Sequence, residues 1–155
     1  MDLAFTHPVT DVSSTAKVPL GTVREAANVE YLYVYSPVAI NAYRAVVLAS
    51  GVTNYTVSPT TIAPVASGDA TMAVGVTQTA IPASSYFWVA QKGYVTVEQT
   101  AVSGSLSPAK LVVATTSGTV ATYDPASDSA PYIVGQSMAP LGNYSLTIPA
   151  FIDCK

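Results

Sequence analysis

Alternation of side-chain type is the feature that most constrains this chain. In the segment 30–35, three tyrosines, Tyr31, Tyr33 and Tyr35, alternate with Leu32 and Val34. Successive side chains of a strand point to opposite faces, so this segment predicts a strand with a tyrosine face and an aliphatic face. Similar apolar runs recur, and Gly, Pro, Asn and Asp separate them about every ten residues. The pattern predicts an all-β fold, a compact antiparallel β-sandwich or β-barrel.

The low charge of the chain favours strands over helices. Only 10% of the residues are Asp, Glu, Lys or Arg. Surface helices usually expose such residues, whereas the Thr, Ser, Gln and Tyr found here suit half-buried strands. Some helical character is confined to Thr22–Asn28, around Arg24-Glu25-Ala26-Ala27, where we expect a turn or two of helix at most, or a loop.

Two pairs of predicted strands have the spacing of β-hairpins. Segments 86–90 and 94–97 flank Gln91-Lys92-Gly93, and segments 110–115 and 119–123 flank Ser117-Gly118. A short connection that contains glycine favours a tight turn between antiparallel strands. Further strands are predicted at 43–48, 73–77, 132–135 and 144–152.

The N-terminal segment differs from the rest of the chain. It has few large apolar residues and is rich in Thr, Ser and Asp. We therefore interpret residues 1–18 as an extended arm outside the core, and residues 19–155 as a single β domain. We expect a core without residues 1–17 to fold.

The titratable residues predict no catalytic site. The single histidine, His7, lies in the arm, and the single cysteine, Cys154, lies next to the C-terminus, so neither a catalytic triad nor a zinc site can be assembled from them. Asp124 and Asp128 lie in a short loop with ordinary turn chemistry. We expect no enzyme activity, no cofactor and no metal.

Charge and hydropathy also exclude two kinds of partner. Six Lys and Arg against nine Asp and Glu give a net charge of −3. Six cations are too few for a basic stripe that neutralises phosphates. No signal peptide is visible, and Asn54, Pro59 and Pro64 interrupt the uncharged stretch 45–68, so no transmembrane helix is expected. We expect neither direct nucleic-acid binding nor a membrane.

Candidate partner-binding residues lie in the arm and on the tyrosine face. They are His7, Val9, Val12, Tyr31, Tyr33 and Tyr35. Tyrosine offers a large contact area with a polar tip, so the stripe can be a recognition face. Equally, it can belong to a strand that has one core face and one rim face. Both interpretations stay open at this point.

The order of the short motifs resembles a family of phage proteins. Leu20-Gly21-Thr22 precedes Glu30-Tyr31-Leu32-Tyr33-Val34, then Val74-Gly75-Val76, Tyr86-Phe87-Trp88-Val89, Gly118-Thr119-Val120 and Ile133-Val134-Gly135. Across roughly 18–152, this series resembles the head decoration, or capsid cement, proteins of tailed bacteriophages. Where relatives often have Gly before the Glu-Tyr pair, this chain has Asn28-Val29, which leaves the turn geometry there open.

The resemblance implies a structural role without catalysis. It implies a homotrimer on the capsid surface of the virion, made in the host bacterial cytoplasm, with the major capsid protein as partner. The protein would bind at junctions between capsid subunits and stabilise the shell. Two alternatives remain: a head-fibre, tail or adhesin module that binds a host glycan, and a small β-barrel enzyme or ligand-binding domain.

Overall fold

The computed structural model confirms the all-β fold. It describes residues 8–48, 55–58, 73–99, 111–114, 119–122, 133–137 and 146–154, and these residues contain strands and no helix. The strands are β1 (Val23–Ala26), β2 (Val29–Ser36), β3 (Ala45–Leu48), β4 (Val57–Ser58), β5 (Ala73–Val76), β6 (Ser85–Gln99), β7 (Leu111–Ala114), β8 (Val120–Thr122), β9 (Ile133–Ser137) and β10 (Leu146–Asp153). All ten belong to one sheet.

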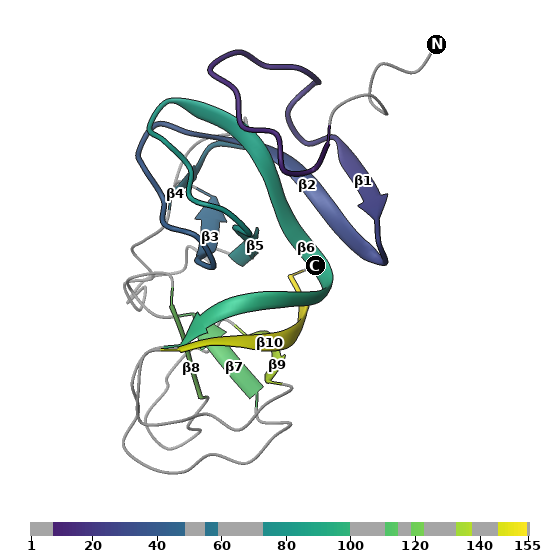
Figure 1. Ribbon diagram of the computed structural model, residues 1–155, viewed down its shortest axis with the longest axis vertical. Coiled ribbons are helices and arrows are strands. Elements are labelled where there is room, and N and C mark those ends of the chain that lie inside the picture. The colour runs from purple at the N-terminus through teal and green to yellow at the C-terminus, as the bar shows by residue number, and fades with distance from the viewer. Residues whose placement is uncertain are drawn as a thin grey trace, which may run out of the picture.

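The long strand β6 organises the molecule (Figure 1). Its first half pairs with β2, from Ser36↔Ser85 to Glu30↔Lys92, and its second half pairs with β10. The predicted hairpin around Gln91-Lys92-Gly93 is therefore wrong, because β6 runs through these residues without reversing. Gly93 adopts a φ of 125° just beyond a register shift, where Tyr31 pairs with Ala90 but Glu30 pairs with Lys92, so this glycine serves a bend in one strand.

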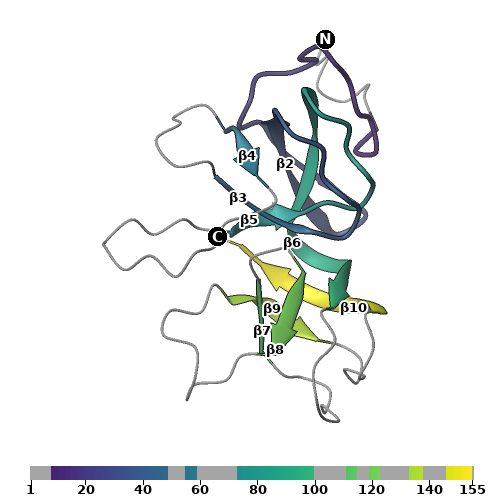
Figure 2. The same cartoon turned by 90° about the vertical axis from the view of Figure 1, so that its left-hand side faces the viewer.

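Two rings of strands share β6. Neighbouring pairs join β2, β6, β5, β3 and β4, and a bridge between Tyr35 and Thr56 closes this first ring. A second ring runs through β6, β10, β9, β7 and β8, and closes where Gln99 pairs with Val120. Figure 2 shows the two groups of strands one above the other. The predicted pairing of the strands around Ser117-Gly118 is confirmed, since β7 and β8 are antiparallel.

Side chains that alternate along the strands pack into separate hydrophobic clusters. Leu32 and Val34 of β2 and Phe87 and Val89 of β6 are buried together within the first ring. In the second half of β6, Val95 and Val97 are buried against Ile148, Ala150 and Ile152 of β10 and against residues of β3 and β5. The aliphatic face predicted for Leu32 and Val34 is thus confirmed.

Strand β1 replaces the helical turn or loop expected over Thr22–Asn28. It pairs with β2 from Val23↔Leu32 to Ala26↔Val29, which leaves a two-residue connection. Ala27 and Asn28 adopt φ values of 51° and 61°. Two left-handed residues in succession are the signature of a type I′ hairpin turn. The expectation of helix failed because the pairing partner, β2, outweighs the local preference of Arg24-Glu25-Ala26-Ala27.

The described part of the N-terminal segment lies against the sheet. Ser13 forms an antiparallel bridge with Tyr86, and Val18 is buried next to Tyr33 and Trp88. The expectation that this segment takes no part in the core is therefore wrong for Val18, because this apolar side chain packs on the aromatic side chains of Tyr33 and Trp88. The boundary at residue 18 stays a prediction, and His7 lies outside the described residues.

Candidate interaction surface

The tyrosine face of β2 and the facing side of β6 form an aromatic layer of Tyr33, Tyr35, Tyr86 and Trp88. The ring centroids of Tyr33 and Trp88 lie 4.9 Å apart, and those of Tyr35 and Tyr86 lie 4.8 Å apart. These are separations at which tilted rings attract one another. Cross-strand register explains the contacts, since Tyr33 is opposite Trp88 and Tyr35 is opposite Tyr86.

The chain itself covers much of this layer. Val9, Val18 and Leu20 pack against it, which leaves Tyr33 only 2% exposed and Trp88 only 4% exposed. Tyr31 and Tyr35 are half-buried, and Val12 packs on the core of the first ring. Tyr33 therefore lies on a packed face, and burial raises the pKa of both Tyr31 and Tyr33. Partner binding stays a prediction for all six candidate residues, His7, Val9, Val12, Tyr31, Tyr33 and Tyr35.

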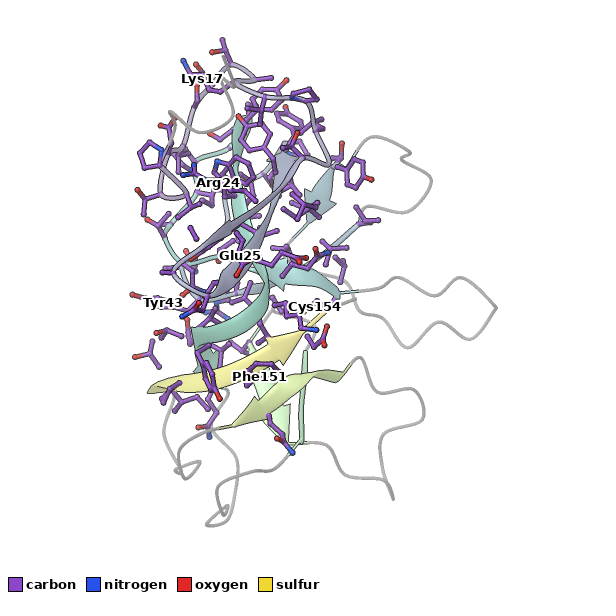
Figure 3. The ribbon with its side chains drawn as sticks, turned by 90° about the vertical axis from the view of Figure 1, so that its right-hand side faces the viewer. Lys17, Arg24, Glu25, Tyr43, Phe151 and Cys154 are labelled. Carbon is purple, nitrogen blue, oxygen red and sulfur yellow. The ribbon has the colours of Figure 1, made fainter. Side chains whose placement is uncertain are left out.

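A second aromatic pair, the exposed Tyr94 and the half-buried Phe151, lies on the outer face of β6 and β10. This outer face consists of the alternate residues Lys92, Tyr94, Thr96 and Glu98 of β6, opposite Asp153, Phe151, Pro149 and Thr147 of β10. Tyr94 is 65% exposed, and its ring meets Phe151 edge-on at 5.1 Å (Figure 3 labels Phe151). This face was not predicted from the sequence, although Tyr94, Thr96 and Glu98 alternate with the buried Val95 and Val97.

The charged residues of the outer face are already paired. Lys92 and Asp153 form a half-exposed ion pair of 3.0 Å, and Arg44 reaches Glu98 at 2.9 Å with both side chains largely buried. Exposed pairs contribute little stability. In each of the two ion pairs, however, the opposite charges cancel. Removing water from such a pair costs less free energy than removing it from the same charges unpaired.

Hydrogen bonds from the loops hold the outer face rigid. The Gln78 side chain donates to the carbonyl of Thr96 at 3.1 Å and accepts from the N–H of Thr96 at 3.3 Å. The carbonyl of Tyr43, a residue with a φ of 63°, accepts from the N–H of Glu98 at 2.9 Å. These contacts occupy the edge of β6 that β10 leaves unpaired, so this half of β6 is hydrogen-bonded along both edges.

The described residues provide no assembled chemistry. Among them, no group of three or more His, Cys, Asp or Glu is placed to hold a metal ion. Burial raises the pKa of the Cys154 thiol to about 12, and the nearby Asp153 carboxylate contributes to this. A thiol that stays neutral is a poor nucleophile. The predicted absence of enzyme activity remains a prediction, and Asp124 and Asp128 lie outside the described residues.

Comparison with known proteins finds a structural likeness without a sequence match. No protein-family model matches the chain, and no curated protein matches its sequence. The fold is similar to the crystal structure of the head fiber gp8.5 N base in bacteriophage phi29, with a TM-score of 0.53 and 11% identity. The match covers 81% of this chain and 94% of that chain, so nearly all of the solved base is included. At this identity the likeness shows a shared fold.

In the described part of the chain, no helix is long and apolar enough to cross a bilayer.

Proposed function

We propose that this chain is a structural protein of a tailed-phage head that attaches to the outer surface of the capsid. The observation that carries the proposal is the fold shared with the phi29 head fiber base over 94% of that chain. The order of sequence motifs, which resembles phage head decoration proteins, supports the same setting independently. Fold alone does not imply function, so the proposal also needs a surface that suits attachment.

The outer face of β6 and β10 is the attachment surface that we favour. It presents Tyr94 and Phe151 on two strands paired over eight residues, from Leu146↔Gln99 to Asp153↔Lys92. Exposed aromatic side chains held by rigid strands lose little conformational freedom on binding, and such residues dominate the energetics of protein interfaces. The proposed partner is the major capsid protein.

Two finer roles fit this setting, and each has its own support. The structural likeness favours a fibre base, which anchors a projecting structure to the head. The motif order favours a cement protein, which lies at junctions between capsid subunits and stabilises the shell. A homotrimer fits both roles and stays a proposal that light scattering on the purified protein can test.

Binding to phage heads that lack this protein tests the attachment. Wild-type protein is expected to sediment with such heads, and Tyr94→Ala/Phe151→Ala is expected to bind at least about tenfold more weakly, because one hot-spot aromatic contributes about 2 kcal/mol or more. Val38→Ala is the control, since Val38 is 44% exposed and follows Ser36, which pairs with Ser85 at the other end of β6. Failure of the wild-type protein to bind heads would contradict the proposal. Equal binding by the double variant would show that another surface of the protein makes the attachment.

Heating and imaging separate the two finer roles. A cement protein is expected to form a regular surface lattice, and heads without it should release DNA at a lower temperature. A fibre base is expected to leave the temperature of DNA release unchanged and to be imaged beneath a projecting fibre. Either outcome supports a head protein and rejects one of the two roles.

A further inference from the structure

The described N-terminal residues form a strap, residues 8–18, that lies across the aromatic layer without adding a strand to the sheet. Its backbone pairs with β6 at Ser13, where the N–H of Ser13 donates to the carbonyl of Tyr86 at 3.0 Å and the N–H of Tyr86 donates back at 2.8 Å. The N–H of Lys17 donates to the hydroxyl of Tyr33 at 3.2 Å. Within the strap, Val18 is buried, whereas Val9, Val12 and Ser13 are only partly so. A segment with so few buried groups belongs to the low end of local stability.

The aromatic layer beneath the strap is, in contrast, deeply buried. The rings of Tyr33 and Trp88 are almost fully buried there, with Val18 in the same cluster. Exposing such a group of rings costs on the order of several kcal/mol. An uncovered layer would therefore bind whichever apolar segment fits it, and the segment whose fit is already visible is the strap, with Val9 and Val18 against the rings.

A tight turn connects the strap to β1. The carbonyl of Pro19 accepts from the N–H of Thr22 at 3.2 Å, and Gly21 at the third position of the turn has a φ of 82°. A Cβ at Gly21 would collide with the ring of Tyr55, so this closed turn requires glycine. If residues 19–22 straightened, this four-residue hinge would span at most about 14 Å, so the copy that receives the strap must lie directly beside the copy that provides it. Figure 1 shows the strap at the outer end of the molecule, far from β7, β8 and β9.

From these features we propose that the strap exchanges between copies of this chain, so that residues 8–18 of one copy cover the aromatic layer of another. Each copy keeps every contact that the strap makes, and the turn at 19–22 opens to carry the chain across. Exchange of an identical segment forms an oligomer at low cost, because no new complementary surface has to exist. The inference does not depend on the proposed function, since it concerns the purified protein alone.

A cysteine pair distinguishes exchange from a strap that stays on its own chain. Ser13 and Tyr86 are antiparallel bridge partners, whose Cα atoms lie about 5.5 Å apart in such a pair, within the range that a disulfide spans. Mild oxidation of purified Ser13→Cys/Tyr86→Cys is expected to give covalent multimers on a denaturing gel, and a reductant should return them to single chains. The two single-cysteine variants and wild type, whose Cys154 is buried, are expected to give no such multimers.

Two results would overturn exchange. One is a product that consists entirely of single chains with an internal disulfide between the two introduced cysteines, identified by mass. The other is a pair of introduced thiols that stay free in a folded protein, because Ser13 then lies next to Tyr86 in neither arrangement.

The turn offers a second test that leaves the aromatic layer intact. Gly21→Ala is expected to raise the ratio of multimer to monomer in light scattering at least about threefold, because alanine disfavours the closed turn by about 1 kcal/mol or more. Ala27→Gly, in the adjacent β1–β2 turn, is the control and is expected to leave the ratio unchanged. A folded Gly21→Ala protein with an unchanged or lower ratio would also reject the exchange.

Discussion

The hydroxyl of Thr77 ties the loop before β3 to the end of β5. Thr77 is fully buried, and its Oγ1 accepts from the N–H of Arg44 at 3.0 Å and donates to the carbonyl of Asn41 at 2.9 Å. The backbone of Thr77 also accepts from the N–H of Tyr43 at 2.8 Å. Tyr43 is a bulky residue in the left-handed region, which is a strained state that persists only when its surroundings determine it.

Replacing that hydroxyl should therefore cost more than its size suggests. Thr77→Val keeps the shape of the side chain but leaves two backbone groups without their partner, so we expect a loss of about 1–3 kcal/mol in the free energy of unfolding. Urea denaturation measures the loss. Thr77→Ser, which keeps the hydroxyl, is expected to lose less than half as much; an equal loss would assign the effect to packing.

Cys154 makes stability depend on alkaline pH. Burial, followed by the charge of Asp153, raises the pKa of this thiol to about 12 in the folded protein. The unfolded chain releases the proton from about pH 8.5, so the stabilisation is present below that pH and is lost as the pH rises towards 12. The loss attributable to Cys154 is at most about 1.4 kcal/mol per pH unit.

The measurement is the difference in free energy of unfolding between wild type and Cys154→Ala, taken from pH 8 to 11. The wild type is expected to lose stability relative to the variant as the pH increases. The tyrosines with raised pKa, Tyr31 and Tyr33, weaken both proteins alike at high pH, so the comparison isolates Cys154. A constant difference would show that the thiol titrates normally.

At the scale of elements, the β1–β2 hairpin carries a residue that does not suit its turn. Ala27 occupies the first left-handed position of the type I′ turn, with a φ of 51°, where Asn, Asp or Gly is favoured. Ala27→Gly is expected to raise the free energy of unfolding by about 1 kcal/mol, because the left-handed penalty of alanine is removed. Thermal unfolding checks this; Ala26→Gly, inside β1, is the control and should destabilise the protein.

Strands could be predicted from the sequence wherever apolar and polar side chains alternate within one short segment. The strand around Tyr31 and Tyr33 and the pairing of β7 with β8 follow from neighbouring residues, and both are confirmed. The continuous β6 was not predictable, because Lys92-Gly93 has the composition of a turn and only pairing with two different strands, β2 and β10, shows that it is a bend.

At the scale of the whole molecule, both rings depend on the bend in β6. Gly93 has a φ of 125°, and an added Cβ would lie 2.7 Å from the carbonyl oxygen of Asn28. Gly93→Ala is expected to destabilise the protein by about 2 kcal/mol or more, through backbone strain and this collision. Lys92→Ala, at the exposed neighbouring position, is expected to change the free energy of unfolding by less than about 0.5 kcal/mol.

A shared strand also predicts cooperative unfolding. Trp88 fluorescence reports on the first ring, and far-UV circular dichroism reports on all strands, so the two denaturation curves should coincide for wild type. A separate, earlier transition in circular dichroism would show that the second ring unfolds independently of the first.

The sequence by itself determined the all-β class, the two-faced character of β2 and the absence of a triad or zinc-binding residue set, because these depend on residue types and on spacing within one segment. Only the tertiary structure decided which aromatic rings are open to a partner. Tyr33 and Trp88 are covered by the strap, whereas Tyr94 and Phe151 come together from β6 and β10, where Tyr94 stays exposed and Phe151 is half-buried. The physical reason is that burial is a property of what packs on a strand face, and the segments that pack there are distant in the chain.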